Sequence, residues 1–130
     1  MNTIEIRTKA RQEFVDLTPD VERLVAASGI TSGICVVTVP HTTAGVTVNE
    51  NADPDVRADI AMTLARMVPD ALPYTHGEGN APAHVKASLI GSSVTLIVEG
   101  GGLRLGTWQA IFFCEFDGPR SRKACVQVLG

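Results

Sequence analysis

Residues 40–54 read PHTTAGVTVNENADP, and they connect two β-like runs to the start of a helix. One β-branched run, 34–39, leads into the stretch, and a second run, 44–48, lies within it. Asp53-Pro54 is a helix-entry signal, because aspartate suits the helix start and proline the first helical position. A histidine, several hydroxyls and a block of amide and carboxylate side chains stand between these elements. A simple folded domain has little need for so many hydrogen-bonding groups, so we interpret the stretch as half of a functional site.

Length and composition indicate one folded domain over residues 1–130. The chain has 130 residues, of which 45% are hydrophobic and 19% are charged, which is enough to bury a real core. Its formal net charge is −3, whereas nucleic-acid-binding proteins usually carry a basic face. We therefore expect no nucleic-acid partner.

Three further features predict a cytoplasmic protein. No apolar run approaches the roughly 18 residues that a membrane helix needs, so we expect no membrane partner. The N-terminal residues alternate and are polar, unlike a signal peptide. Cys35, Cys114 and Cys125 are odd in number, form no C-x-x-C pair and lie in apolar strand-like runs. We interpret them as buried free thiols in a reducing compartment.

Hydrophobic periodicity and turn signals predict about eight strands and three helices. The expected strands cover 3–8, 14–17, 33–39, 44–48, 93–99, 103–105, 107–116 and 125–129. The expected helices cover 18–28, 54–67 and 81–89. Residues 69–82 form a long loop with several polar side chains, and a loop of that length in a compact domain is usually functional or disordered.

The short spacing of the strands predicts how they pair. We expect 3–8 to pair with 14–17, 33–39 with 44–48, and 107–116 with 125–129. The run 33–39 does not alternate, which predicts a central strand covered on both faces. The expected fold is α+β, a largely antiparallel two-sheet β-sandwich with about three flanking helices.

The chain has only three histidines, His41, His76 and His84, and all lie in or beside predicted loops. Imidazole is the commonest metal ligand and titrates near neutrality. His76-Gly77-Glu78 followed by His84 puts two imidazoles and a carboxylate within a short reach, and a three-ligand site would suit zinc or another divalent metal. Histidines that only form hydrogen bonds are the alternative.

Familiar enzyme motifs are missing elsewhere. There is no P-C-x-x-C of a zinc deaminase, no G-x-S-x-G of a serine hydrolase and no Walker A motif. The basic cluster Arg120, Arg122 and Lys123 is either a solvated hairpin or an anion site, and we favour the hairpin. Glu115 lies in an apolar run, so it is either on a strand edge or lining a polar pocket, because a lone buried charge is costly.

Five motifs resemble the signature of the YjbQ family, also called UPF0047. They are 41–56, Tyr74-x-His76, 80–86, 105–109 and 115–120, and the resemblance runs from about Ile4 to Gly130. It implies a small α+β sandwich that assembles as a homotrimer with sites near subunit boundaries. Some members are regarded as thiamine-phosphate synthases, which join a pyrimidine methyl diphosphate to a thiazole phosphate and release pyrophosphate.

The resemblance and the chemistry of that reaction suggest roles for particular residues. The expected catalytic residues are His41, Glu50, His84, Lys86 and Glu115. The expected ligand-binding residues are Thr42, Thr43, Asn49, Trp108, Gln109, Asp117 and Arg120. A divalent metal, zinc or magnesium, would be held by His41, His76 and His84.

Two other functions fit the same residues. The chain has no recognisable nucleophile or diphosphate clamp, which favours a non-catalytic homotrimer that binds a metal or a small anion. Three histidines would also suit a metal-dependent hydrolase that acts through a metal-bound water. In each case the expected partners are other copies of the chain and a small phosphate-bearing or pyrimidine-like ligand.

Overall fold

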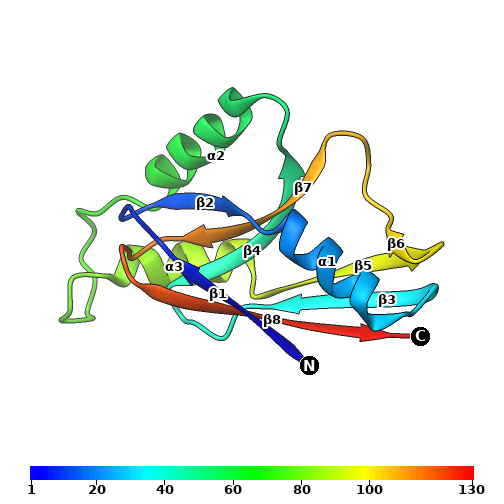
Figure 1. Cartoon of the computed structure of the whole chain (residues 1–130). Coiled ribbons are helices and arrows are strands. Elements are labelled where there is room, and N and C mark those ends of the chain that lie inside the picture. Colours follow the sequence, from blue (N-terminus) through cyan, green and yellow to red (C-terminus); the bar gives the residue numbers. More distant parts are fainter.

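The structure is a computed structural model that describes residues 1–130, and it contains two antiparallel sheets and three helices (Figure 1). The five-stranded sheet has the order β1-β8-β3-β5-β6. Its strands are β1 (Asn2–Arg7), β8 (Ser121–Leu129), β3 (Ser32–Thr38), β5 (Ser93–Glu99) and β6 (Gly102–Leu103). The three-stranded sheet has the order β2-β7-β4. Its strands are β2 (Glu13–Asp16), β7 (Gln109–Glu115) and β4 (Ala44–Glu50). The predicted α+β two-sheet architecture is confirmed.

The helices are α1 (Thr18–Ser28), α2 (Pro54–Met67) and α3 (Ala81–Ile90), close to their predicted bounds. Each has a proline in its first turn, where the missing N–H has no intrahelical partner to lose. Asp53 caps α2, since its side chain accepts a hydrogen bond from the Asp55 N–H. None of the helices is long and apolar enough to cross a membrane.

Strand β7 is buried on both faces and separates two hydrophobic clusters. Its Ile111 and Phe113 join the core between the two sheets, which α1 closes with Val21 and Val25. The alternate residues of β7 face the other way, into a second cluster with α2 and α3; its buried members are Leu64, Ala83, Ala87, Ala110, Phe112, Cys114 and Phe116. The layers are therefore the five-stranded sheet, the three-stranded sheet, and then α2 with α3.

All three predicted strand pairings are wrong. Strand β1 pairs with β8, β2 with β7, β3 with both β5 and β8, and β4 with β7. The reason is that the connections 8–12, 39–43 and 116–120 each carry the chain from one sheet to the other. Proximity in sequence predicted hairpins, whereas the need to bury two apolar faces against each other placed each pair of strands in opposite sheets.

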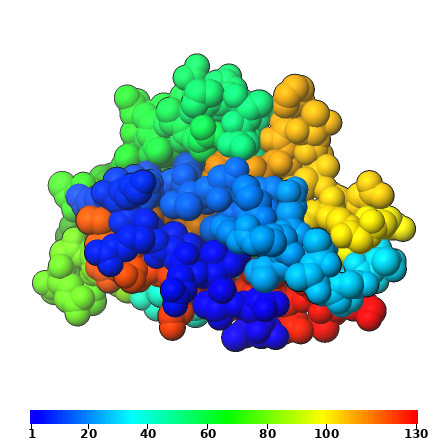
Figure 2. All heavy atoms as spheres, viewed as in Figure 1, coloured from blue at the N-terminus to red at the C-terminus, as the bar shows by residue number.

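Strand β3 is central, as predicted, but only one of its faces is covered. Cys35 and Val37 are buried, whereas Ile34 is 39% exposed on the outer face of the five-stranded sheet. Strand β8 begins at Ser121, before the predicted start, because Arg122 is paired inside the protein and no longer belongs to a loop. In Figure 2 the N-terminal strand and α1 cover the front of the molecule, and the segment around residue 75 projects at the left edge.

Candidate functional site

The three sheet-to-sheet connections meet at one end of the sandwich, where backbone hydrogen bonds join them. Phe116 N donates to Thr43 O at 3.2 Å, Gly118 N to Arg11 O at 2.9 Å, and Thr8 N to Arg120 O at 3.0 Å. Gly118 has no room for a side chain, since a Cβ there would lie 2.3 Å from the Ala10 carbonyl oxygen. Figure 1 shows this end at the left, where β1 leads to β2 and β7 leads to β8.

A buried ion pair lies beneath these connections. Arg122 is 5% exposed and Glu115 is fully buried; the Arg122 Nε donates to both carboxylate oxygens, at 2.9 and 3.2 Å, and its Nη2 pairs with Oε2. Thr8 Oγ1 donates to Glu115 Oε1 at 2.7 Å, and Asp117 N donates to Oε2 at 3.1 Å. Burial alone raises the pKa of the Glu115 carboxyl, but the hydrogen bonds from Arg122, Thr8 and Asp117 outweigh it and hold that pKa below its usual value. Glu115 is therefore a charged anchor for Arg122, inaccessible to a ligand.

Arg122 is held on a second side by Thr43. Its Nη2 donates to the Thr43 Oγ1 at 2.8 Å and to the Thr43 carbonyl oxygen at 3.3 Å. A guanidinium fixed between a carboxylate and a threonine has lost its rotamer freedom before any ligand arrives. Such preorganisation is what makes arginine effective in binding carboxylate and phosphate groups.

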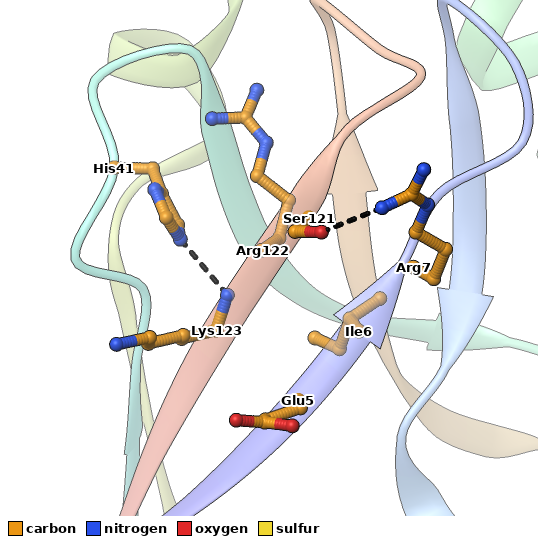
Figure 3. Close-up of a pocket in the computed structure, with 7 residues that line it drawn as sticks. All are labelled: Glu5, Ile6, Arg7, His41, Ser121, Arg122 and Lys123. Atoms are coloured by element: carbon orange, nitrogen blue, oxygen red, sulfur yellow. Dashed lines mark hydrogen bonds between the residues drawn. The ribbon is translucent and has the colours of Figure 1, made fainter.

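His41 is fixed by a strand edge. Strand β3 pairs with β8 only as far as Thr38 and Cys125, so the Lys123 N–H has no strand partner on that side. The His41 Nε2 accepts this N–H at 2.9 Å (Figure 3). The accepting nitrogen carries no proton, so the neutral ring is protonated on Nδ1. Burial, and then the positive charge of Arg122, lower the pKa of His41, which keeps the ring neutral.

His41 and Arg122 line a polar hollow of about 360 Å³. Its lining is mostly polar; the nine residues around it are Pro40, His41, Thr42, Thr43, Glu78, Asn80, His84, Arg120 and Arg122. We call this hollow the histidine–arginine pocket. A neighbouring hollow of about 520 Å³ shares His41, Thr42 and His84 with it and extends toward Ser88 and Ser92. The predicted residues His41, Thr42, Thr43, His84 and Arg120 are thus brought together.

The rim of the pocket contains an acceptor without a partner. Asn80 Nδ2 and Arg120 Nη2 both donate to Asp117 Oδ2, at 2.9 and 3.1 Å. The Asn80 Oδ1 is buried and accepts no hydrogen bond. Buried polar atoms are nearly always paired, so this oxygen is an exception among the buried groups of the chain.

The three histidines do not form a ready metal site. The rings of His76 and His84 are in edge contact, with centroids 5.2 Å apart, and His76 Nε2 lies 3.8 Å from the Glu78 carboxylate. His41 lines the pocket with His84, but its Nε2 is already used by Lys123. No three His, Cys, Asp or Glu side chains of the chain are arranged to hold a metal ion.

Lys86 lies away from the pocket. It follows His84 by two positions on α3, and such residues point to different sides of a helix. Lys86 is 8% exposed, its Nζ donates to Gln12 Oε1 at 3.1 Å, and burial lowers the pKa of its ammonium group.

Four other predicted residues lie at the opposite end of the three-stranded sheet. Glu50 is in register with Gln109, Asn49 precedes Glu50 on β4, and Trp108 is 62% exposed beside the start of β7. The pocket adjoins the Ala44 end of β4, and a strand rises about 3.3 Å per residue, so roughly 20 Å separates the two groups within one chain.

The cysteines are free, and two of them are fully covered. Cys35 and Cys114 are buried, and Cys125 is partly buried. Burial raises the pKa of the Cys35 thiol, and it raises the pKa of Cys114 to about 12. Thiols with raised pKa values make poor nucleophiles.

Two features of the site were not predicted from local sequence signals, the burial of Arg122 and the unpaired oxygen of Asn80. The interpretation of Arg122 as part of a solvated hairpin is wrong, since it is buried in an ion pair. A signal was present: Arg122, Ala124 and Val126 alternate, and the last two are plainly inward-facing residues of a strand. Nothing in the sequence marked the unpaired Asn80 oxygen.

Comparisons with known proteins agree with this fold. A protein-family model described as "UPF0047 protein YjbQ-like" matches residues 2–130. A UPF0047 protein of Methanocaldococcus jannaschii is 50% identical over 126 residues, which cover 97% of this chain and 91% of that protein. The UPF0047 protein YugU of Bacillus subtilis is 47% identical over 135 residues, which cover 100% of this chain and 99% of that protein.

Solved structures show the same architecture. The crystal structure of an uncharacterised conserved protein of the YjbQ/UPF0047 family from Clostridium acetobutylicum superposes with a TM-score of 0.97, at 50% identity, covering 99% of this chain and 100% of that one. A conserved hypothetical protein from Thermus thermophilus gives a TM-score of 0.92 at 42% identity, covering 99% of this chain and 100% of that one. The chain therefore belongs to the YjbQ/UPF0047 family.

Proposed function

We propose that the histidine–arginine pocket binds a small phosphate-bearing molecule, and that the protein acts on it as a thiamine-phosphate synthase-like transferase of weak or secondary activity. The observation that carries the proposal is the mostly polar lining of the pocket. It includes two imidazoles and two guanidinium groups, each guanidinium held in place by a carboxylate of the protein. Such fork-shaped and N–H donors suit phosphate oxygens.

In the proposed reaction, the bond between the pyrimidine methyl carbon and the diphosphate oxygen breaks. Pyrophosphate leaves with the bonding electrons, and the ring nitrogen of the thiazole phosphate forms the new C–N bond. Negative charge grows on the leaving oxygen, and donors fixed in advance stabilise it most effectively. Arg122, held by Glu115 and Thr43, and the Nδ1–H of His41 are such donors.

Pyrophosphate release tests this function. Purified protein would be given a pyrimidine methyl diphosphate together with a thiazole phosphate, and released pyrophosphate would be measured. We expect His84→Ala and Arg120→Gln to lower the rate by about tenfold or more, whereas Arg23→Gln on the exposed side of α1 leaves it unchanged. Loss of release in the control, or no release by the unaltered protein, contradicts the transferase.

The main alternative is a homotrimer that binds an anion or a metal without turnover. It is favoured by a pocket lining that contains no cysteine and no lysine to act as a nucleophile. Phosphate binding without pyrophosphate release would identify this function. A metal at His41, His76 and His84, or a metal-dependent hydrolase, needs a further donor, since one chain does not gather three. Elemental analysis of protein purified without chelator, compared with His84→Ala, tests both.

We also propose that the chain assembles with copies of itself as a homotrimer. Three large apolar side chains form a ladder across the outer face of the five-stranded sheet, because Ile34 is in register with both Ile97 and Leu129. Their exposed fractions are 39%, 59% and 50%. Exposed contiguous apolar side chains favour association.

We propose a cytoplasmic location as well. The three free cysteines support it, because disulfides are rare and free thiols are stable in reducing compartments.

A further inference from the structure

A second hollow lies on the other side of His41, on the outer face of the β1–β8 pair (Figure 3). Its volume is about 320 Å³, and its lining consists of Glu5, Ile6, Arg7, His41, Ser121, Arg122 and Lys123. Six of these residues are in-register pairs on two neighbouring strands, Glu5 with Lys123, Ile6 with Arg122, and Arg7 with Ser121. We call it the outer hollow. It sits on regular strands, so the sheet fixes the spacing of its lining residues.

The outer hollow has positive charge that the protein does not neutralise. Arg7 donates from Nη1 to the Ser121 hydroxyl at 2.9 Å, which orients its guanidinium. Neither Arg7 nor Lys123 is in any of the ion pairs of the chain, although Glu5 is the register partner of Lys123. A chain with a formal net charge of −3 therefore keeps two unpaired cations and an oriented hydroxyl at one place.

The two hollows share a wall. His41 and Arg122 line both the outer hollow and the histidine–arginine pocket. Arg120 and Arg122 are paired with Asp117 and Glu115, so the unpaired positive charge lies on the Arg7 and Lys123 side of His41. A single phosphate group would fill only one side of that wall.

We propose that the outer hollow is a second anion subsite, which takes a phosphate monoester group while the histidine–arginine pocket takes another. Only the phosphate group in the histidine–arginine pocket rests on the proposed function; binding of a phosphate group in the outer hollow does not depend on it. Arg7 supplies a planar fork, Lys123 a point charge, and Ser121 a hydroxyl. Glu5 is the only acidic residue in the lining, and it weakens binding of any anion there.

Backbone amide NMR with inorganic phosphate as the probe tests the subsite. The amides of Glu5 and Ser121 report on the outer hollow, and those of Asn80 and Ala81 report on the pocket. We expect both sets to shift in the unaltered protein. In the variant Arg7→Gln/Lys123→Gln, the affinity reported by Glu5 and Ser121 should fall about tenfold or more, while that reported by Asn80 stays the same.

Two matched variants sharpen the test. Glu5→Gln removes one opposing charge from the same hollow, so it should tighten phosphate binding at Ser121 without changing Asn80. Arg120→Gln should give the reverse pattern, weaker at Asn80 and unchanged at Ser121. Arg23→Gln, on α1, should change neither.

The results separate the two proposals. The second subsite is overturned if Ser121 does not shift while Asn80 saturates, or if its shift persists unchanged in Arg7→Gln/Lys123→Gln. Failure of Asn80 to shift, with a normal response at Ser121, overturns the histidine–arginine pocket instead.

Discussion

At the scale of residues, the most consequential contact is the one between Glu115 and Arg122. Each charge is buried, so each depends on the other for compensation. The sequence indicated that Glu115 is unusual, since a carboxylate in an apolar strand needs a partner. It did not identify the partner, because Arg122 stands in a polar run that resembles a loop and pairs across two different sheets.

Replacing Glu115 with glutamine should destabilise the fold strongly. The change leaves the Arg122 guanidinium buried without a countercharge, which costs about 3–5 kcal/mol. Urea denaturation at pH 7 measures it. The double variant Glu115→Leu/Arg122→Leu is the control. Its loss of unfolding free energy should be less than the sum of the losses in Glu115→Leu and Arg122→Leu measured singly. Additive losses would show that the pair is not coupled.

The same carboxylate should make stability depend on acidity. Because the pKa of Glu115 is lower in the folded protein, its contribution is complete above its unfolded pKa of about 4.3 and is lost as the pH falls through the folded pKa. The difference in unfolding free energy between the unaltered protein and Glu115→Gln should therefore shrink between pH 7 and pH 3. A constant difference would contradict the assignment.

His41 should be a neutral ring protonated on Nδ1. Long-range nitrogen–proton NMR spectra of the imidazole distinguish the two tautomers and follow the titration. We expect His41 to titrate below free histidine, because burial and the charge of Arg122 lower its pKa. Since that folded pKa is depressed, the contribution of His41 to stability is present above about pH 6.5 and lost as the pH falls through the folded value. An Nε2-protonated ring would refute the contact with Lys123.

At the scale of elements, the helices were predictable and the strand pairings were not. Local signals suffice for a helix, as with Asp53-Pro54 at the start of α2. Sheet membership depends on which faces meet across the core, and no local signal separates a hairpin from a crossing between sheets. The start of β8 was missed because Ser121, Arg122 and Lys123 are polar. The predicted site residues fall into two groups in the structure, because β4 and β7 carry motif residues at both of their ends.

Two residues of helix α3 should have different roles, one in ligand binding and one in stability. His84 faces the pocket, whereas Lys86 is buried beside Gln12. His84→Ala should weaken inorganic phosphate binding about tenfold with little change in melting temperature. Lys86→Met should leave phosphate affinity unchanged and alter the unfolding free energy by about 1 kcal/mol. Calorimetric titration and thermal melts measure both, and equal losses of affinity would mean that both side chains reach the ligand.

The connection 116–120 should tolerate no side chain at Gly118. A Cβ there would lie 2.3 Å from the Ala10 carbonyl oxygen and 2.8 Å from Glu115 Cγ, so Gly118→Ala should cost about 1–3 kcal/mol. Gly77→Ala is the matched control, since no atom lies within 4 Å of a Cβ at that position. Equilibrium unfolding compares them, and equal stability of the two variants would argue against tight packing of the connections.

At the scale of the whole molecule, the outer face of the five-stranded sheet bears on assembly. If copies associate through the apolar ladder, Ile34→Thr/Ile97→Thr should shift the protein toward monomers in light scattering after size-exclusion chromatography. Threonine keeps the preference for strands. Met62→Gln, a change at an exposed residue of α2, should leave the mass unchanged. A trimer that survives the ladder variant uses another surface.

Because the three connections meet at one end, the pocket can form only late in the synthesis and folding of the chain. Thr8 bonds to Arg120 across 112 positions of the chain, and Arg122 bonds to Thr43 across 79. Contacts so distant in sequence form slowly, since long loops must close first. A nascent chain on the ribosome therefore has no complete pocket until residue 122 has emerged. A truncation before β8 removes Arg122 from both hollows, together with the strand that joins β1 to β3.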